Sequence, residues 1–299
     1  MVNPDPQLAE FPYQPHFADI GAHRLAYLDE GPEEDRAAPV LVMLHGNPSW
    51  SYLFRNLVAR LRGRFRCIVP DHLGCGFSDK PQAASYRLAM HIDNLEALLA
   101  ALGIGRCGLV VHDWGGAIGM GWAVRHPGRV AAMVVCNTAA FRSGQIPRRI
   151  ALCRLPLLGP LAVRGLNAFV QAATLMAVRR RMRPEIAAGF AAPYDSWARR
   201  VAILRFVQDI PMQPAHPSWA TLVAIEAALP TLADKPLLLA WGGRDFCFGR
   251  DFYEEWRRRF PHAEAHWFPE AGHYLFEDAG AEIFPLIDDF CSRNLRKQA

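Results

Sequence analysis

The sequence contains no Gly-x-Ser-x-Gly motif, although a chain of 299 residues with alternating apolar runs suits an enzyme built around one. This absence excludes the usual serine nucleophile elbow. The chain also lacks an uncharged apolar stretch of about 18 residues, so no membrane span is expected. Its first residues, MVNPDPQLAEFPYQ, do not place an apolar core after a basic start, so no secretory signal is predicted.

Cysteine occurs without any paired pattern. The seven cysteines are odd in number, show no Cys-x-x-Cys spacing, and several fall inside apolar runs. This usage is typical of buried free thiols in a reducing compartment. We therefore expect a cytoplasmic protein without a disulfide framework.

Acidic residues are missing from one long stretch. No Asp or Glu occurs between Trp114 and Pro184, whereas eleven arginines do. The net charge of +4 is too small to indicate nucleic-acid binding, so no nucleic-acid partner is expected. A solvated basic face is the simplest interpretation. The alternatives are contact with an anionic membrane surface or an acidic protein assembly, and a homo-oligomer also stays open.

Short apolar runs alternate with helix-length amphipathic segments. The runs cover residues 40–46, 65–71, 108–113, 130–137 and 236–243. They predict buried parallel strands. Residues 16–20 and 23–31 alternate like an antiparallel hairpin that precedes them. The pattern predicts a mostly parallel, doubly wound α/β sheet, in which sites form at the carboxyl ends of the strands.

This alternation stops between Thr138 and Thr231. The stretch is rich in Ala, Leu and Arg, is interrupted by prolines and shows no clear strand. We predict a helical cap over residues 139–230, inserted after the sixth strand. The core of the fold would then consist of residues 1–138 and 231–299.

The segment VHDWGG places Asp113 where a strand should turn into a helix. Gly115 and Gly116 are the small neighbours that a nucleophile elbow needs, although Val111 stands where the strict motif has glycine. A serine that displaced a group from saturated carbon would form an inert ether. A carboxylate forms an ester that can be reopened. Asp113 is therefore the predicted nucleophile, and a helix N-cap is its alternative role.

The segment HGNPSW follows the strand at 40–46 and supplies a second part of the predicted site. The backbone amides of Asn47 and Trp114 would form an oxyanion hole. Their side chains carry neutral N–H donors that suit an anionic leaving group. A turn asparagine and a packed tryptophan are the structural alternatives.

Asp245 follows an apolar strand in WGGRDF, and His273 follows 28 residues later in AGHYLFED. His273 is the predicted base that activates water for ester hydrolysis, and Asp245 would orient it. Two other positions compete for the acid. The strand at 130–137 ends in Asn137, which has no carboxylate, and Asp209 in the cap is a weaker candidate.

No cofactor or metal is predicted. The glycines of GAIGMG, residues 116–121, superficially match a dinucleotide motif. They follow an elbow, however, and suit close packing of a helix on the sheet. The loop DHLGCGFSD, residues 71–79, is interpreted as a turn after a strand.

Taken together, these motifs resemble the haloalkane dehalogenase family of α/β-hydrolases over nearly the whole chain. The matching segments are HGNPSWSYLFRNL, DHLGCGFSDKP, VHDWGGAIG, WGGRDF and AGHYLFED. The resemblance implies an α/β-hydrolase fold and assigns Asp113 as nucleophile, His273 as base and Asp245 as acid. It also implies that Asn47 and Trp114 hold the leaving group.

Three cap segments, NTAAF, APYDSWARR and RFVQDIP, resemble the β-lactone decarboxylases of bacterial olefin biosynthesis. This implies a small apolar electrophile as substrate: a cis-β-lactone that yields a cis-alkene and carbon dioxide. Whether attack falls on the alkyl or the carbonyl carbon stays open. Haloalkane hydrolysis is the first alternative. Epoxide hydrolysis ranks third among the three reactions, because it needs cap tyrosines and the cap offers only Tyr194. A non-catalytic scaffold protein is the alternative from another class.

Overall fold

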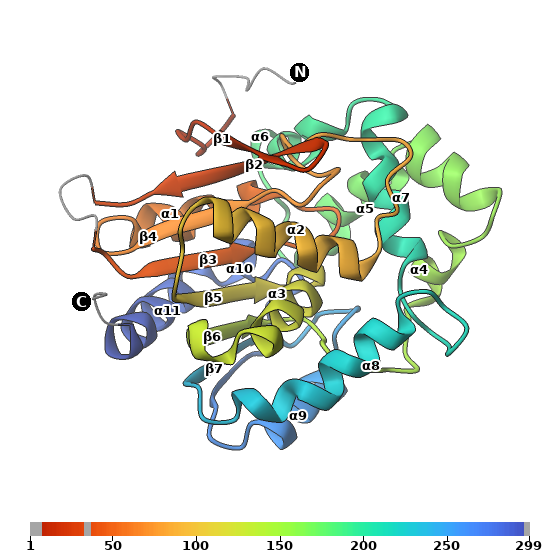
Figure 1. The fold of residues 1–299 in the computed structure, drawn as a ribbon. Coiled ribbons are helices and arrows are strands. Elements are labelled where there is room, and N and C mark those ends of the chain that lie inside the picture. Colours follow the sequence, from red (N-terminus) through yellow and green to blue (C-terminus); the bar gives the residue numbers. More distant parts are fainter. Residues whose placement is uncertain (1–7, 33–36, 296–299) are drawn as a thin grey trace.

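The protein is built around a mixed sheet that has helices on both faces (Figure 1). The computed structural model describes residues 8–32 and 37–295. Within these ranges the sheet has eight strands in the order β1-β2-β4-β3-β5-β6-β7-β8. The strands are β1 (His16–Ile20), β2 (His23–Glu30), β3 (Val40–Leu44), β4 (Arg66–Pro70), β5 (Cys107–His112), β6 (Val130–Cys136), β7 (Leu237–Gly242) and β8 (Glu264–Phe268).

The strand pairing confirms the predicted topology. β1 and β2 form an antiparallel hairpin, and β2 also runs antiparallel to β4. From β4 through β3 and β5 to β8, neighbouring strands are parallel. Five parallel strands and the hairpin were predicted, whereas β8 was missed. Its sequence EAHWF mixes polar and apolar residues and is only partly buried, because it lies at the edge of the sheet.

Successive residues of the central strands face opposite sides of the sheet and create two separate cores. Met43 and Val110 belong to one core, whereas Val42 and Val111 belong to the other. This follows from the two-residue period of a strand. The fully apolar sequences of the central strands are therefore explained by helices that cover both faces.

Eleven α-helices occur in the described part of the chain, and none of them is long and apolar enough to cross a membrane. The helices are α1 (Arg55–Leu61), α2 (Leu88–Ala101), α3 (Trp114–Arg125), α4 (Arg148–Leu152), α5 (Ala168–Met176), α6 (Pro184–Ala191), α7 (Val201–Gln208), α8 (Trp219–Ala228), α9 (Arg250–Arg259), α10 (Leu275–Asp278) and α11 (Gly280–Asn294). Residues of α1 and α11 join one core, and residues of α2, α3 and α9 join the other.

The segment between β6 and β7 forms the cap. It contains α4 to α8 and, in agreement with the prediction, no strand among its residues, all of which are described. In Figure 1, α4, α5 and α7 lie beyond the carboxyl ends of the parallel strands. The helical cap after the sixth strand is therefore confirmed. The exact division of the chain at residues 139 and 230 stays a prediction.

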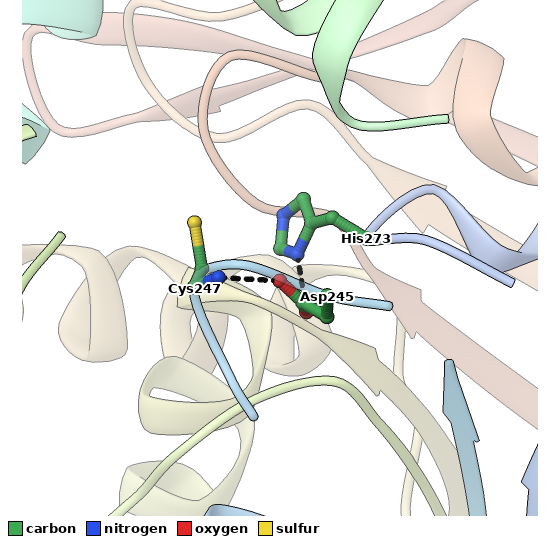
Figure 2. Close-up of side chains that lie close together, drawn as sticks. All are labelled: Asp245, Cys247 and His273. Atoms are coloured by element: carbon green, nitrogen blue, oxygen red, sulfur yellow. Dashed lines mark hydrogen bonds and ion pairs between the residues drawn. The ribbon is translucent and has the colours of Figure 1, made fainter. Parts of the chain in front are cut away.

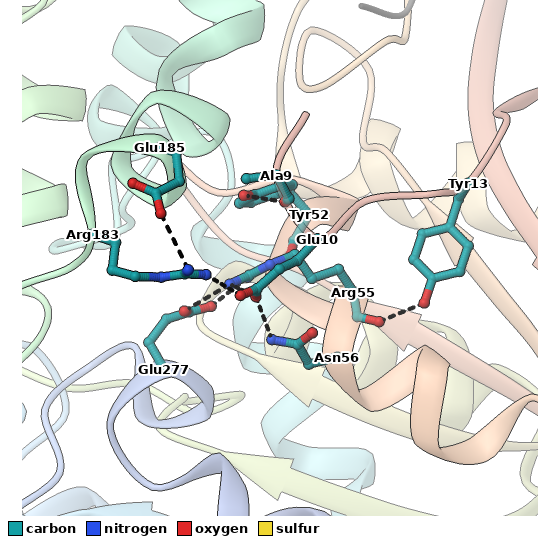
Figure 3. A network of polar contacts seen from close by, with 9 residues as sticks. All are labelled: Ala9, Glu10, Tyr13, Tyr52, Arg55, Asn56, Arg183, Glu185 and Glu277. Carbon is teal, nitrogen blue, oxygen red and sulfur yellow. Dashed lines mark hydrogen bonds and ion pairs between the residues drawn. The ribbon is translucent and has the colours of Figure 1, made fainter. Parts of the chain in front are cut away.

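A buried arginine joins the N-terminal stretch, the core and the cap (Figure 3). Arg55 of α1 is 1% exposed and donates hydrogen bonds of 2.5 and 2.9 Å to the carboxylate of Glu277 in α10. It also pairs with Glu10, which in turn binds Arg183 at the start of α6. Because a buried guanidinium needs partners to offset its lost hydration, this network fixes three segments together.

Candidate active site

Asp113 lies on a tight turn between β5 and α3. β5 ends at His112 and α3 begins at Trp114, and Asp113 between them has a φ of 52°. A positive φ is unfavourable for a residue with a side chain, so the turn stores strain that the surrounding fold must hold. A Cβ at Gly115 would collide with the carbonyl oxygen of Leu44. The predicted elbow is thus present, and its glycine is required by close packing.

The carboxylate of Asp113 is held by backbone amides. Its Oδ1 accepts a hydrogen bond of 2.7 Å from the amide of Asn47, and the amide of Trp114 also donates to the carboxylate. The other oxygen, Oδ2, lies 3.8 Å from Nε2 of His273. The structure therefore brings together the predicted nucleophile, both predicted oxyanion donors and the predicted base.

Asp245 and His273 form a buried pair. Asp245 follows β7 and His273 follows β8, so both lie at the carboxyl edge of the sheet. Nδ1 of His273 is 2.8 Å from Oδ2 of Asp245, and the amide of Cys247 donates a hydrogen bond of 2.6 Å to Oδ1 of Asp245 (Figure 2). This arrangement leaves Nε2 of His273 directed toward Asp113.

Asn137, which follows β6, supports the acid. Its Nδ2 donates a hydrogen bond of 2.8 Å to Oδ2 of Asp245, and its Oδ1 accepts one of 2.8 Å from the amide of Gly242. The sequence indicated Asn137 only as a rival acid position without a carboxylate. Its place after a parallel strand was the signal for a supporting role, because neighbouring strand ends meet at one edge.

Asp209 does not belong to this arrangement. Its carboxylate pairs with Arg87 at 2.8 Å and accepts hydrogen bonds from Ser218 and the amide of Leu88. These contacts fasten the end of α7 to the start of α2. The weaker acid candidate is thus a structural residue of the cap.

A mostly apolar cavity of about 350 Å³ opens over the carboxylate of Asp113. Asn47, Asp113, Trp114 and His273 line its floor. Apolar cap residues form its walls, among them Phe141, Ile150, Phe169, Met176, Val207, Ile210 and Leu222. A cavity of this size and polarity suits an apolar small molecule that is held by few polar groups.

Comparison with known proteins places this arrangement in a family. Residues 39–280 match the family model described as alpha/beta hydrolase fold. This chain belongs to that family. It is 45% identical over 286 residues to the cis-3-alkyl-4-alkyloxetan-2-one decarboxylase of Shewanella oneidensis, with 93% of this chain and 88% of the relative covered. It is 46% identical over 281 residues to the enzyme of the same name from Xanthomonas campestris, with 90% and 93% covered.

A solved structure supports the same assignment. The haloalkane dehalogenase from Bradyrhizobium elkani superposes with a TM-score of 0.86 at 28% identity, and the match covers 94% of this chain and 98% of that one. The resemblance to haloalkane dehalogenases and β-lactone decarboxylases is thereby confirmed. This chain is an enzyme of the α/β-hydrolase family.

In this α/β-hydrolase, burial and neighbouring charges act against each other at the site. Burial raises the pKa of Asp113 above its usual value, although His273 and the two backbone amides oppose the shift. Burial also acts to lower the pKa of His273, but the Asp245 and Asp113 carboxylates outweigh it and raise that pKa. For Asp245, the favourable contacts with His273 and the Cys247 amide overcome burial and lower the pKa. Asp245 is therefore the residue best held as an anion.

His112 forms a hydrogen bond with the backbone of the predicted base, His273. Its Nε2 is 2.8 Å from the backbone carbonyl oxygen of His273. Burial lowers the pKa of His112 to about 3, so its ring is neutral and donates one N–H to that oxygen. The residue that ends β5 thus fixes the backbone of the residue that faces the nucleophile.

The side chains of Trp114 and Asn47 differ in their freedom to bind a ligand. The indole N–H of Trp114 has no hydrogen-bond partner among residues 8–32 and 37–295, and Trp114 lines the cavity. Nδ2 of Asn47 already donates to the carbonyl oxygen of Ile203 at 3.2 Å, which leaves one hydrogen for a ligand. Both side chains can therefore donate to an anionic leaving group, as the sequence suggested.

One cluster could geometrically hold a metal ion. Ligand atoms of Asp245, Cys247 and His273 lie within 4.8 Å of one another (Figure 2). Both oxygens of Asp245 already accept hydrogen bonds, and burial raises the pKa of the Cys247 thiol, which keeps it protonated. A metal needs deprotonated ligands, so these residues fit an acid–histidine pair better than a metal site.

Proposed function

We propose that this enzyme is a cis-3-alkyl-4-alkyloxetan-2-one decarboxylase that converts a cis-β-lactone into a cis-alkene and carbon dioxide. Asp113 is the nucleophile, and His273 and Asp245 support it. One observation carries the proposal: the carboxylate of Asp113 occupies a nucleophile elbow at the floor of an apolar cavity. The two relatives of that name, at 45% and 46% identity, support the choice of substrate.

The first step of the proposed reaction is attack by Asp113 on the saturated ring carbon that carries the ring oxygen. Oδ1 of Asp113 accepts a hydrogen bond from the amide of Asn47, and Oδ2, which lies 3.8 Å from Nε2 of His273, is taken as the oxygen that reacts. Attack at the ring carbon that carries the ring oxygen forms a bond between that carbon and Oδ2. The bond between the carbon and the ring oxygen breaks, and its electron pair becomes a free carboxylate on the former lactone.

The resulting ester can decompose without water. The electron pair of the bond between the substrate carboxylate and its neighbouring carbon becomes the new carbon–carbon double bond. The ester bond to Oδ2 breaks, its pair returns to Asp113, and carbon dioxide leaves. Inversion in the first step followed by anti elimination in the second gives a cis-alkene from a cis-lactone. No proton is consumed, and Asp113 is regenerated.

The surroundings of Asp113 favour both steps. The indole N–H of Trp114 lines the cavity and can hold the carboxylate released from the ring. Apolar walls disfavour that charge, and loss of carbon dioxide removes it. The negative charge returns to Asp113, where the amide of Asn47 donates a hydrogen bond to Oδ1 and Nε2 of His273 lies 3.8 Å from Oδ2.

Haloalkane hydrolysis is the second candidate, because it shares the first step. It differs in the second, where His273 would activate water to open the ester. Epoxide hydrolysis is disfavoured by the position of Tyr194. This residue is fully buried, its hydroxyl donates to the carbonyl oxygen of Ser49, and it is absent from the cavity wall.

A parallel assay with a cis-dialkyl β-lactone and a 1-bromoalkane tests the proposal. We expect alkene and carbon dioxide from the lactone and no bromide from the bromoalkane. Bromide and alcohol without alkene would instead assign haloalkane hydrolysis. A single turnover of the lactone in ¹⁸O-water, followed by peptide mass analysis, tests the mechanism. The Asp113 peptide should stay unlabelled, and a label there would show that water opens the intermediate.

A further inference from the structure

The outer surface of the cap exposes an unusual number of leucines. Leu157 is 88% exposed, Leu166 is 70% and Leu175 is 67%. Four more lie between 44% and 59% exposed, namely Leu152, Leu155, Leu158 and Leu161. Single exposed apolar residues are ordinary, but a cluster of this kind on one part of a protein marks a contact surface. We call residues 148–181 the leucine–arginine surface.

Six of these leucines, all except Leu175, lie on the single segment from residue 152 to residue 166. The amide of Leu155 donates to the carbonyl of Leu152, and the amide of Leu166 donates to that of Leu161, so the segment is compactly wound. Trp197, which is half exposed, extends the apolar area, because the guanidinium of Arg164 lies 4.6 Å from its ring centre. In Figure 1, α4 and α5 lie on the side of the molecule opposite to α11.

Five arginine side chains of the same segment form no ion pair within the described ranges. Among the residues that the structure describes, the side chains of Arg148, Arg154, Arg179, Arg180 and Arg181 form no ion pair or hydrogen bond. Most other arginines are paired; Arg55, Arg60 and Arg66 are examples. No carboxylate occurs between residues 114 and 184. Asp278 reaches this segment, but it accepts hydrogen bonds from the backbone amides of Arg179 and Arg180 and not from their guanidinium groups.

The leucine–arginine surface is also the outer wall of the active-site cavity. In α4 and the turn after it, Ile150 and Cys153 line the cavity while Leu152 faces outward. In α5, Phe169 and Met176 line the cavity while Leu175 is exposed. A molecule bound to this surface would therefore lie one helix thickness from the substrate.

We infer that the leucine–arginine surface binds an anionic lipid bilayer. Its leucines would enter the boundary between headgroups and acyl chains, and its arginines would contact lipid phosphates. A second copy of the chain is a poor occupant, since it would bring unpaired arginines together. Leucine is also under-represented among the residues that dominate protein–protein binding. The binding does not depend on the proposed function. If that function holds, the surface would admit long-chain substrate directly from the lipid.

Sedimentation with vesicles tests the inference. The purified enzyme is mixed with vesicles of phosphatidylglycerol and phosphatidylcholine, or of phosphatidylcholine alone, at low salt. We expect binding to the anionic vesicles only. Leu157→Glu combined with Leu161→Glu should weaken it at least about tenfold, because it removes apolar insertion. Arg148→Glu should weaken it about fivefold or more, since one basic residue contributes on that order.

Matched controls carry the same chemical changes elsewhere. Phe17→Glu replaces an apolar residue that is 42% exposed on β1, and Arg250→Glu reverses a charge on α9. Both should bind vesicles like the unchanged enzyme. Circular dichroism checks that every variant folds. The leucines are exposed, so their replacement should not unfold the protein.

Three results would overturn the inference. One is the absence of binding to anionic vesicles. Another is equal binding to neutral vesicles, which would leave the arginines without a role. The third is association that the leucine variants abolish in the absence of lipid. Light scattering would detect this association as a dimer of the chain. In the first case, retention of the enzyme on polyglutamate would indicate that the surface binds an acidic protein.

Discussion

Charged side chains are paired at the catalytic edge of the sheet, whereas several on the outer surface of the cap are unpaired among the described residues. At the catalytic edge, Asp245 accepts hydrogen bonds from His273, Asn137 and the Cys247 amide. On the leucine–arginine surface, arginines such as Arg148 have no partner in the described part of the chain. Buried charges must be paired because they have lost water, whereas exposed charges need not be. Unpaired arginines beside exposed leucines are therefore consistent with the anionic lipid bilayer that we propose as the ligand of this surface.

The same difference appears in apolar packing. Leu57 of α1 is 1% exposed and belongs to a core, whereas Leu157 is 88% exposed. One leucine contributes to folding and the other cannot. Sequence patterns alone give them the same chemical character, so only their positions distinguish a stabilising residue from a surface one.

The largest expected effect concerns Asp113. Asp113→Asn keeps the size of the side chain but removes the nucleophilic charge, so kcat should fall by at least about 10⁴-fold, as for other nucleophile variants. Turnover and thermal unfolding are measured together. Turnover retained in a folded variant would show that the residue is structural and that the catalytic edge has another nucleophile.

Next in size is a comparison of two arginines. Arg55→Ala leaves Glu277 without its buried partner and should reduce the free energy of unfolding by about 3–5 kcal/mol. Arg148→Ala breaks no contact and should change it by less than about 0.5 kcal/mol. Urea unfolding measures both. If both variants lost a similar free energy of unfolding, the contrast between a paired core arginine and an unpaired cap arginine would be wrong.

Removal of Asn137 should have a smaller effect on catalysis. In Asn137→Ala, Asp245 loses one of its donors and His273 becomes less well oriented, so kcat should fall by about 10- to 100-fold with little change in KM. Leu57→Ala is the control, since it lowers stability without touching the site. If Leu57→Ala lowered kcat equally, the effect of Asn137 would be one of stability alone.

The smallest expected effect is a displaced pH dependence. Burial raises the pKa of Asp113 above 3.8, its usual value, so the nucleophile takes up a proton at a higher pH than an ordinary aspartate. The acid limb of kcat/KM should accordingly lie above pH 3.8. A pH–rate profile measures it. A limb at or below the ordinary aspartate value would show that the amides and His273 outweigh burial.

Much of the fold was predictable from local patterns. Central strands such as β3 and β5 are continuous apolar runs because helices cover both of their faces. β8 was missed because an edge strand is buried on fewer sides and does not need such a run. The cap was recognised by its prolines and by the loss of alternation, but the directions of its helices depend on packing that no local pattern records.

The candidate site shows the same division. Asp113, Asp245 and His273 follow strand ends or sit beside glycines, so their positions could be predicted and the structure brings them together. Asn137 has the same signal but could not be assigned a partner, because its contact with Asp245 spans 108 residues. The sequence alone left Asp209 as a possible acid. In the structure its carboxylate is bound by Arg87 and Ser218, contacts that no local pattern records.

The sequence by itself determined the chemistry. A carboxylate at the elbow, two neutral donors and an acid–histidine pair are properties of residue types and spacing. Tertiary structure decided which of these groups meet, which polar atoms are buried, and which leucines and arginines face outward. These features depend on contacts between distant segments, and their energies come from burial, which exists only once the chain has folded.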